Sequence, residues 1–510
     1  MNCRLKIICH PDPELVEGEG PAFLALASSP MSATEVAQMK MWSGRFRQPL
    51  DPEFEKWQRS FPYDQRLLPF ELAASRAHAN ALEHAGVLSS EELSEIVKAL
   101  GEIGRRAESE PAFLNDPEAE DVHHFVEKQL AALIGPTGYK LHTGRSRNEQ
   151  IATDLRLFVR QSIDTVQNLI ADWIEAILAR ADAAGSASSP LAMPAYTHLQ
   201  PAEPVLVAHW LLAYVEMFLR DAARLVDCRK RANLCPLGSG AVAGATLTLN
   251  RQAMAAELGF DGLTANSIDA TSDRDFAIEF VDALSLLALH LSRWAEEMIL
   301  FSTPAYGFVE LPEPYSTGSS AMPQKKNPDL LELVRGKAAR VMGCATTLQT
   351  LVKGLPLAYN KDLQETQEPL FDASDTVIGM LPLVTGFMNT VEFNEAKMNH
   401  AASSGFMNAW AAAAYLVERG VPSRLAHEAV GKAVQLAVER GCDLQKLPLA
   451  DLQAIHSSFD AGFHSCLGLT EVLALHDVPG GTAPRHVKRA LQNARERVAA
   501  LRSREPLAAW

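Results

Sequence analysis

The amino-acid sequence predicts an all-α protein in three parts, with a bundle of long helices at its centre. Apolar residues recur at the spacing of a helix over five long stretches in the middle of the chain, and few segments show the alternation typical of strands. Side chains suited to chemistry are concentrated in the short segments between these stretches. That distribution is typical of a scaffold whose loops carry its function.

The longest helical pattern begins at Ile151. Its apolar residues, among them Leu155, Phe158 and Ile163, fall on one side of a helix over roughly thirty residues, against an average of about 11–12 for helices in globular proteins. Similar stretches lie at about 205–232, 275–302, 329–353 and 367–391. Their length predicts an elongated bundle and association with further copies of the chain.

The segments on either side of the centre also predict helices, although shorter ones. In "SSEELSEIVKALGEIGRRA" (89–107), Ser89 or Ser90 and Glu92 can form a capping box. In "SRLAHEAVGKAVQLAVERG" (423–441), the final glycine is placed to end the helix. We therefore predict an N-terminal helical domain over 41–150, a central long-helix bundle over 151–397 and a C-terminal helical domain over 398–510.

The first forty residues differ from the rest of the chain. The stretch "HPDPELVEGEGP" (10–21) is rich in proline, glycine and glutamate, and it has no periodic apolar face. Our hypothesis is that residues 1–40 are a disordered or spurious extension and that the fold begins near Trp42. The sequence leaves open whether translation starts at Met1, Met31, Met39 or Met41.

The composition is that of an ordinary globular protein with a formal charge of −15. No basic stripe offsets this acidic balance, which argues against nucleic acid and membrane surfaces as partners. The seven cysteines show no paired or metal-ligand spacing, so we expect free thiols and a cytoplasmic protein. The longest uncharged apolar stretch, about 376–391, is too short to cross a bilayer and predicts a buried helix.

One junction, "LHTGRSRNEQ" (141–150), lies directly before the longest helix. Gly144 permits a tight turn, after which Ser146, Arg147 and Asn148 offer a hydroxyl, a guanidinium and an amide group. A helix N-terminus with an arginine beside it is suited to bind an anion. The equally weighted alternative is that Ser146 and Asn148 only cap the helix.

A second junction, "YTHLQPAEPV" (196–205), places Thr197 and His198 before two prolines that delay the next helix. His198 is therefore expected in a constrained loop, where its imidazole can act as a general acid or base near neutral pH. A purely structural histidine is the alternative, as it is for His123 and His142.

A third junction, "TGSSAMPQKKNPD" (317–329), gathers hydroxyls and cations in a loop marked by glycine and proline. Ser319 and Ser320 need activation to react, and Lys325 and Lys326 supply positive potential that favours an alkoxide or binds a carboxylate. The alternative is a surface loop with solvated lysines. The chain has no GxSxG, Walker, HExxH or dinucleotide-binding motif, so hydrolase, NTPase and metalloenzyme functions lack support.

The third junction resembles the GSSxMPxKxNP signature of the fumarase/aspartase superfamily, whose members eliminate an amine or water β to a carboxylate and release fumarate. Together with it, six further segments are similar to the argininosuccinate lyase family, in the order that the family has them. These are "WSGRF" (42–46), "LHTGRSRNEQ", "YTHLQ", "PLGSGAVAGA" (236–245), "ANSIDATSDRDF" (265–276) and "YNKDLQE" (359–365). The resemblance extends from about Trp42 to "GGTAPR" (480–485).

The resemblance implies a three-domain, mostly helical fold of the fumarase/aspartase type. It implies a homotetramer in which the long helices of four chains form one bundle and three different chains build each active site. The reaction it implies is the β-elimination of argininosuccinate to L-arginine and fumarate, a step of arginine biosynthesis. This carbon–nitrogen lyase would need no metal and no organic cofactor.

The resemblance also assigns roles to particular residues. Ser319 would take a proton from the carbon next to a carboxylate, and Lys325 would stabilise the doubly charged aci-carboxylate that results. His198 would be the other proton-transfer residue, with Glu332 as its partner. The assignment of acid and base to His198 and Ser319 stays open, although we favour Ser319 as the base. The substrate-binding residues that the resemblance implies are Ser60, Asn148, Thr197, Asn327, Tyr359 and Gln364.

At several positions the chain departs from the family pattern. Gln367 stands in place of a substrate-contacting lysine, which exchanges a charge-assisted hydrogen bond for a neutral one and should weaken binding by roughly 1–2 kcal/mol. Glu71 and Ala74 replace an aspartate and a glycine, and Glu149 replaces another aspartate. The segment 409–417 lacks a common acidic residue. The Gln367 change bears on affinity and not on the class of reaction. The residues retained at the chemistry are Ser319, Lys325, Asn327, His198 and Glu332.

Two other functions stay open. The chain could be another carbon–nitrogen lyase of the superfamily, such as an adenylosuccinate lyase, or a structural protein of the δ-crystallin type that uses the same tetramer. Assays with both substrates would separate the two enzymes, and release of fumarate would separate either from the structural protein.

Overall fold

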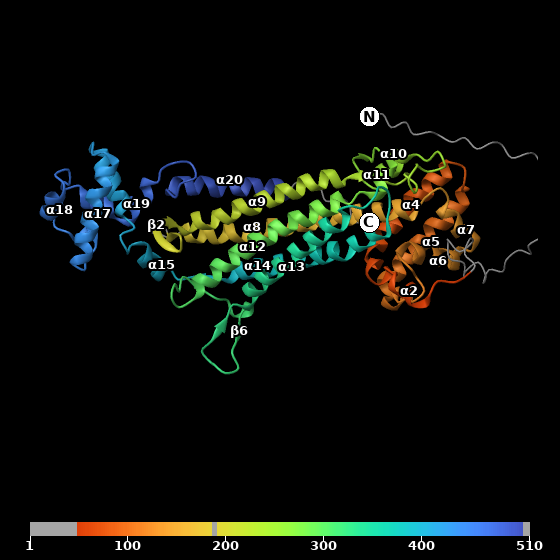
Figure 1. Ribbon diagram of the computed structural model, residues 1–510, viewed down its shortest axis with the longest axis horizontal. Helices are drawn as coiled ribbons and strands as arrows, with labels where there is room; N and C mark the ends of the chain where they lie inside the picture. The colour runs from red at the N-terminus through yellow and green to blue at the C-terminus, as the bar shows by residue number, and fades with distance from the viewer. Residues whose placement is uncertain (1–47, 186–190, 503–510) are drawn as a thin grey trace, which may run out of the picture. The chain divides into compact units, whose positions relative to one another are not determined.

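The computed structural model of the chain describes residues 48–185 and 191–502 (Figure 1). Residues 53–510 form one compact unit, to which every long helix belongs. The segment "WSGRF" and the predicted extension 1–40 lie outside the described residues. The hypothesis about where the fold begins therefore stays a prediction.

Five long helices form the centre of this unit, where the sequence predicted them. They are α8 (Arg147–Gly185), α9 (Val207–Ala232), α12 (Asp275–Ser302), α13 (Asp329–Val352) and α14 (Gln367–Thr390). Helix α12 packs along α13, α8 along α9, and α14 against both α8 and α13 (Figure 1). The all-α prediction is confirmed. At 39 residues α8 is longer than predicted, because its first turn begins before Ile151.

Aromatic side chains fill the centre of the bundle. Trp173 of α8 and Trp294 of α12 are fully buried, and their rings meet edge to face with centroids 4.8 Å apart. Phe218 of α9 and Phe387 of α14 pack edge-on against this pair, each with centroids 5.6 Å apart. Because these four side chains come from four different helices, their packing fixes which helix faces meet.

The segment Lys361–Thr390 is the only one in the described part of the chain that is long and apolar enough to cross a membrane by length and composition. It comprises the 3₁₀-helix η6 (Lys361–Thr366) and α14, and 56% of its apolar window is buried inside the protein. Leu370, Val377 and Leu381 of α14 are fully buried. The segment is thus a core helix of the bundle, in agreement with the buried helix predicted at 376–391.

Shorter helices surround the beginning of α8. They are α2 (Pro52–Trp57), α3 (Phe61–Asp64), α4 (Leu68–His84), α5 (Ser90–Ser109), α6 (Val122–Ile134) and α7 (Pro136–Tyr139). The predicted capping box is present at α5. The Glu92 amide donates to Ser89 Oγ at 3.2 Å, and the Ser89 amide donates to Glu92 Oε2 at 3.0 Å. Helix α5 therefore begins where the sequence predicted.

After the bundle the chain forms a smaller group of helices. They are α15 (Glu395–Ala402), α16 (Ala409–Glu418), α17 (Ser423–Glu439), α18 (Leu449–Ile455) and α19 (Leu469–Leu475). Helices α16 to α18 share an apolar cluster of their own. The last helix, α20 (Pro484–Arg502), instead packs along α8 and α9. The division into three domains stays a prediction, and α20 is a helix of the bundle by its contacts.

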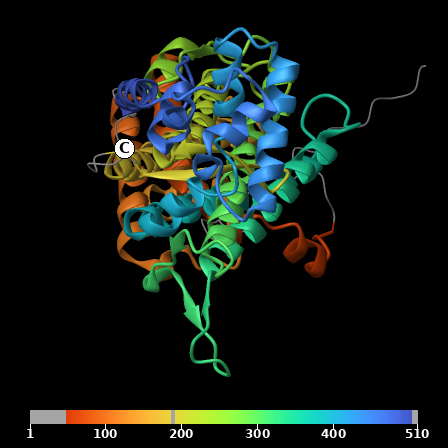
Figure 2. The same cartoon turned by 90° about the vertical axis from the view of Figure 1, so that its left-hand side faces the viewer.

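Two β-hairpins interrupt the helical pattern where the sequence predicted loops. Strand β1 (Ala192–Thr197) pairs antiparallel with β2 (Gln200–Leu206), and Pro194 faces Pro204. Two prolines can oppose each other only at a pair that exchanges no hydrogen bonds, so this ladder tolerates them. Strand β6 (Thr317–Gly318) pairs with β7 (Lys326–Asn327), and their loop projects from the bundle (Figures 1 and 2).

The connection between α9 and α12 is compact. It contains α10 (Arg251–Glu257), α11 (Ser267–Ser272) and the parallel two-residue strands β3 (Leu234–Cys235) and β4 (Gly262–Leu263). A further pair, β5 (Val309–Glu310) with β8 (Glu392–Phe393), joins the ends of α12 and α14. The glycine-rich segment 236–246 lies within the first of these connections, between β3 and α10.

Candidate active site

The first turn of α8 carries Asn148, one of the predicted substrate contacts. Ser146 caps this helix, because its Oγ accepts the Asn148 amide at 3.2 Å. The capping role that the sequence offered for Ser146 is therefore present. Arg147 is already paired, with its Nη1 atom 3.2 Å from Glu120 Oε2 and 3.1 Å from Asp121 Oδ2. The anion site expected from Arg147 is thus occupied by the protein's own carboxylates.

Ser60 lies close to that turn. Its hydroxyl donates to Asp64 Oδ2 at 2.6 Å, and the Val122 amide donates to Asp64 Oδ1 at 3.0 Å. Burial, reinforced by the negative charge of Asp121, raises the pKa of Asp64 despite the hydrogen bond from Ser60. Sequence reasoning missed Asp64, although its position four residues after Ser60 was a usable signal, because one helical turn brings such residues together.

Glu120 connects Ser60 with the first turn of α8, and the site residues around it are the first group. Its backbone oxygen accepts the Ser60 amide at 2.9 Å, and its carboxylate lies 3.2 Å from Arg147 and 3.8 Å from Lys361 Nζ. Lys361 opens η6, which also holds Gln364. Sequence analysis gave this glutamate no role.

Tyr359 and Gln364 complete the group. The Gln364 side-chain amide donates to the Gln58 backbone oxygen at 3.0 Å, which ties η6 to the segment before α3. Burial raises the pKa of Tyr359, whereas the charge of Arg274 acts in the opposite direction. Arg274 is 2% exposed, and its Nε and Nη2 atoms have no hydrogen-bond partner among the described residues. The structure therefore gathers Ser60, Asn148, Tyr359 and Gln364 at one end of the bundle.

The second group is on the loop between β6 and β7. Ser319 Oγ accepts the backbone amides of Ala321 and Met322 at 3.3 and 3.2 Å. Asn327 donates to the Gly318 backbone oxygen at 3.3 Å and holds the base of the loop closed. Lys325 is exposed at the end of the loop. The loop therefore presents the predicted base and the predicted cation together, away from the bundle (Figure 2).

The two lysines of this loop differ in their surroundings. Lys326 Nζ lies 2.9 Å from Glu310 Oε1 and is thereby neutralised. Lys325 takes part in no ion pair within the residues described. Its charge remains available for an anionic ligand.

The third group is the turn of the first hairpin. His198 and Leu199 form its two-residue loop, with φ values of 55° and 57°. Two consecutive residues with positive φ suit this kind of hairpin, but side chains other than glycine or asparagine make the conformation strained. Leu199 is 65% exposed, and Thr197 and His198 are also exposed. The turn thus holds His198 outward at a cost in local free energy, which is typical of functional positions.

The predicted partner of His198 lies elsewhere in the chain. Glu332 is exposed on the first turn of α13, where its carboxylate is 3.9 Å from Arg335 Nη2. The structure does not bring Glu332 and His198 together within one chain.

The three groups are far apart within one chain. Helix α8 has 39 residues and is therefore about 60 Å long at 1.5 Å per residue. Asn148 lies in its first turn, whereas its last turn lies beside the start of β1, where Leu191 N donates to Ala184 O at 3.1 Å. Figure 1 shows the N-terminal helices at one end of the bundle, the β1–β2 hairpin at the other, and the β6–β7 hairpin between them.

A buried network of ionic side chains lies next to the first group. His123 Nδ1 lies 2.8 Å from Glu71 Oε2 and 3.8 Å from Asp154 Oδ2, and Arg145 Nη2 lies 3.7 Å from Glu71. Glu71, His123 and Asp154 are types that bind metals, and their ligand atoms lie within 4.8 Å of one another. The short His123–Glu71 hydrogen bond and the charge of Arg145 already satisfy Glu71, so the cluster fits a shared proton better than an ion. For His123 the structural alternative is supported.

This network predicts a dependence of stability on pH. Burial alone would raise the pKa of Glu71, but the charge of His123 and their hydrogen bond outweigh it and lower the pKa. Burial would lower the pKa of His123, but Glu71 raises it overall. Stability from Glu71 is therefore present above its ordinary pKa of 4.5 and lost as the pH falls below it. Stability from His123 is present below its ordinary pKa of 6.5 and lost as the pH rises through its higher folded value.

Replacing Glu71 by glutamine should lower the free energy of unfolding by about 3 kcal/mol near pH 6, since it leaves a buried charge without its partner. Urea denaturation of the native and variant proteins between pH 4 and pH 8 measures this difference. An unchanged free energy of unfolding, or a loss that is the same at every pH, would contradict the ion pair.

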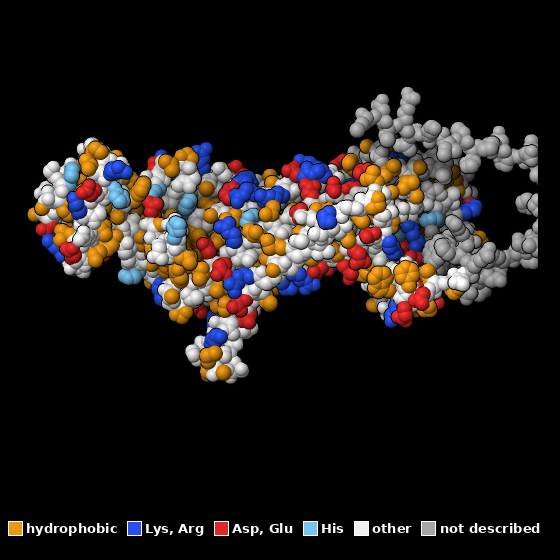
Figure 3. All heavy atoms as spheres, viewed as in Figure 1, with side chains coloured by type: hydrophobic (Ala, Val, Ile, Leu, Met, Phe, Trp, Pro, Cys, Tyr) orange, Lys and Arg blue, Asp and Glu red, His pale blue; other side chains and the backbone are white. Residues whose placement is uncertain are grey.

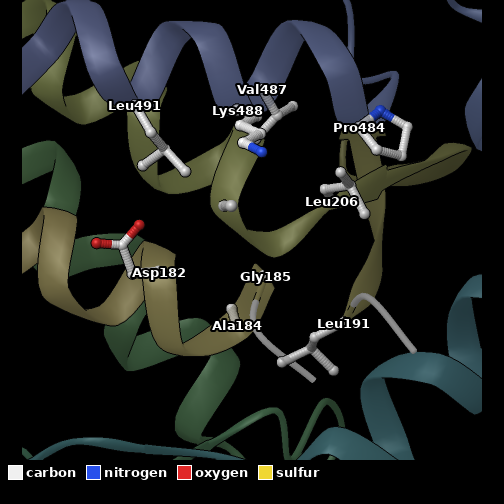
Figure 4. A pocket seen from close by; sticks show the side chains of 10 residues that line it. Asp182, Ala184, Gly185, Leu191, Leu206, Pro484, Val487, Lys488 and Leu491 are labelled. Atoms are coloured by element: carbon white, nitrogen blue, oxygen red, sulfur yellow. The ribbon is translucent and has the colours of Figure 1, made fainter. Parts of the chain in front are cut away.

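A separate cavity of about 440 Å³ lies between the end of α8, β2 and the first turns of α20 (Figure 4). Its wall is mostly apolar and includes Leu206, Val487 and Leu491, with Lys488 at its edge. Asp182, the acidic residue of the wall, pairs with Arg495. None of the predicted site residues lines this cavity. The candidate active site is therefore not this cavity but the three groups of predicted site residues.

Comparison with known proteins identifies the family. The family described as "Lyase" matches residues 44–343, and that described as "Argininosuccinate lyase C-terminal" matches residues 406–474. The chain is 60% identical over 463 residues to an argininosuccinate lyase of Koribacter versatilis, covering 91% of this chain and 98% of the relative. It is 57% identical over 459 residues to an argininosuccinate lyase of Acidobacterium capsulatum, covering 89% and 94%.

Solved structures agree with this result. The crystal structure of EDDS lyase in complex with formate matches with a TM-score of 0.77 at 28% identity and covers 89% of this chain and 92% of that one. A 3-carboxy-cis,cis-muconate lactonizing enzyme from Pseudomonas putida shares the fold alone. It matches with a TM-score of 0.66 at 20% identity and covers 88% of this chain and 100% of that one. The helical fold of the fumarase/aspartase type is therefore confirmed, and the chain belongs to the argininosuccinate lyase family of carbon–nitrogen lyases.

Proposed function

We propose that this chain cleaves argininosuccinate to L-arginine and fumarate in arginine biosynthesis. The observation that carries the proposal is 60% identity over 463 residues with a protein named argininosuccinate lyase. The family resemblance assigns ten residues of this chain to catalysis and substrate binding. The reaction is a β-elimination, in which a proton leaves one carbon of the succinate part and the guanidino nitrogen leaves the neighbouring carbon.

Ser319 is proposed as the base. A hydroxyl is a weak base until its ionised form is stabilised, and the amides of Ala321 and Met322 both donate to Ser319 Oγ. Hydrogen bonds of this kind favour negative charge on the oxygen. The ionised Ser319 takes the proton, the electrons of the C–H bond move into the adjacent carboxylate, and the ammonium of Lys325 stabilises the dianion that forms. Collapse of the dianion forms the C=C bond of fumarate and breaks the C–N bond.

His198 is proposed to serve the leaving nitrogen, with Glu332 of another copy as its partner. Its imidazole can carry a proton to the leaving nitrogen, and the strained turn would hold it in one orientation. Arginine leaves with its guanidinium group protonated, so the bond electrons end on nitrogen without a high-energy anion. We therefore favour His198 as the acid and Ser319 as the base.

A homotetramer with shared sites is part of this proposal. The three groups are separated along about 60 Å of helix in one chain, so only neighbouring copies can combine them. Apolar side chains on the outer faces of α13 and α14 support association, with Leu333 59%, Met342 41% and Leu383 49% exposed. In each site, one copy would supply Ser60, Asn148, Tyr359 and Gln364, a second Thr197 and His198, and a third Ser319, Lys325, Asn327 and Glu332.

Small molecules rather than nucleic acid are proposed as partners, in the cytoplasm. The formal charge is −15, and basic and acidic side chains are interspersed over the bundle on the face shown in Figure 3. Cys228, Cys235 and Cys344 are buried free thiols, which suits a reducing compartment. No metal or organic cofactor is part of the proposed mechanism.

The proposal is tested by the ultraviolet absorbance of fumarate after the protein is mixed with argininosuccinate. Release of fumarate together with arginine supports it. Release from adenylosuccinate but not from argininosuccinate would assign the chain to the other lyase. No release from either at saturating concentration would leave a structural role of the δ-crystallin type.

Gln367 offers a second test, of substrate affinity. It is 3% exposed at the start of α14, and its Oε1 atom has no hydrogen-bond partner among the described residues. In the variant Gln367→Lys a substrate carboxylate would pair with the new ammonium, and we expect KM to fall about tenfold with a smaller change in kcat. Without substrate the buried ammonium has no partner, so the melting temperature should fall.

Steady-state kinetics and thermal denaturation with and without substrate measure both effects. Gln367→Met, which has a similar shape and no charge, is the matched control and should not lower KM. If KM is the same for Gln367→Lys and the native protein, position 367 does not contact the substrate.

A further inference from the structure

The glycine-rich segment "PLGSGAVAGAT" (236–246) has no role in the proposed mechanism, yet it is bonded to the first turn of α8. Glu149 makes the connection and is fully buried. Its Oε2 accepts the Gly240 amide at 2.9 Å, and its Oε1 accepts the Ser146 amide at 3.0 Å. One carboxylate thus joins the loop to the residue that caps the helix carrying Asn148.

The glycines of the loop and the side chain of Arg251 fix its backbone conformation. Gly240 has a φ of 61°, and a Cβ there would lie 2.6 Å from the Gly244 backbone oxygen, so no other residue fits. On the opposite side, Arg251 donates to the Leu237 backbone oxygen at 3.0 Å and to Ser239 Oγ at 3.2 Å. Arg251 and Glu149 therefore both hold the loop, each through hydrogen bonds to different residues of it.

Backbone amides that converge in such a loop form a concave site for an anion, as in phosphate-binding loops. Here the anion is the protein's own. Burial raises the pKa of Glu149, although hydrogen bonds from the amides of Ser146, Gly240 and Gly238 act in the opposite direction and favour its charged form. The loop is thus not open to a free phosphate, and the carboxylate that fills it transmits the position of the loop to α8.

We propose that Glu149 is a positioning residue that fixes Asn148, and with it the affinity for the substrate, by locking the first turn of α8 onto the glycine-rich loop. This inference rests on the proposed function, because it takes Asn148 as a substrate contact. The first amides of a helix lack partners within the helix and its first turn is easily displaced. Glu149 orders that turn before the substrate arrives, which lowers the entropic cost of binding.

The test compares Glu149→Gln and Glu149→Asp with Asp221→Asn in the full chain. Glutamine keeps the length of the side chain. It replaces one carboxylate oxygen by an NH2 group, which would face a backbone N–H group that also donates. Asp221 is the matched control, since it is 1% exposed and held by Arg224 at 2.8 Å and His290 at 2.6 Å within the bundle, away from the site. We expect Glu149→Gln to raise KM about tenfold with less than about a threefold change in kcat. Glu149→Asp should recover part of that loss.

Asp221→Asn should lower the melting temperature and leave KM unchanged. The inference is overturned if Glu149→Gln has the native KM, or if Asp221→Asn raises KM as much. Gly240→Ala tests the loop side of the same contact, and its effect on KM should be less than additive with that of Glu149→Gln, because both break one connection. Fully additive effects would contradict the coupling.

A native protein that releases no fumarate would contradict the proposed function, not this inference. Hydrogen exchange then decides the inference without a substrate. Glu149→Gln should remove protection from the amides of residues 146–150, whereas Asp221→Asn should leave them protected. Equal protection of these amides in both variants would overturn the role of Glu149.

Discussion

Replacing Ser319 by alanine should abolish fumarate release and leave the stability of the protein unchanged. Among the described residues the hydroxyl bonds only to amides of its own loop, those of Ala321 and Met322, so its removal costs the fold little. Without a base at this position the carbon proton has no acceptor. The loss of kcat should be about a thousandfold or more, the usual scale for a general base combined with its positioning.

The neighbouring serine provides the control. Ser320 is exposed on the same loop, and no role is proposed for it. Ser320→Ala should retain kcat close to the native value. The melting temperatures and the molecular masses in solution of both variants should equal those of the native protein. If Ser319→Ala still exchanges the substrate's carbon-bound proton with solvent, the base is another residue.

Mixing two inactive variants should restore activity. Ser319 lies on the projecting loop, whereas Asn148 lies at the start of α8, and no single chain brings the two together. In the proposed tetramer, refolded from equal amounts of Ser319→Ala and Asn148→Ala chains, about a quarter of the sites would combine two unaltered segments from different copies. Fumarate release should therefore rise from nearly none to about a quarter of the native rate.

The matched control uses two changes on one loop. Ser319→Ala and Lys325→Ala chains should not restore each other, because both residues reach a site from the same copy. Refolded native protein shows that assembly itself succeeded. If the pair Ser319→Ala and Asn148→Ala stays inactive while refolded native protein recovers, the sites are not shared between copies.

Local sequence patterns predicted much of the fold. The five long helices, the capping box at Ser89 and the core position of α14 all follow from the periodicity of apolar residues and from helix-end chemistry, which depend on neighbours a few positions away. The two hairpins were predicted as loops. Their strands are short and rich in proline or glycine, and they form because of pairing partners that the local pattern does not reveal.

The sequence by itself determined the residue types of the candidate site and the helical scaffold that carries them. It also determined the family, because the segments similar to that family occur in the same order. Tertiary structure alone decided that Arg147 is already neutralised by Glu120 and Asp121, that Glu149 fills the glycine-rich loop, and that the site residues form three groups instead of one. The reason is physical. The periodicity of apolar residues and the signals at helix ends act over one or two helical turns. Charge pairing and the separation of the site groups depend instead on which remote segments pack together.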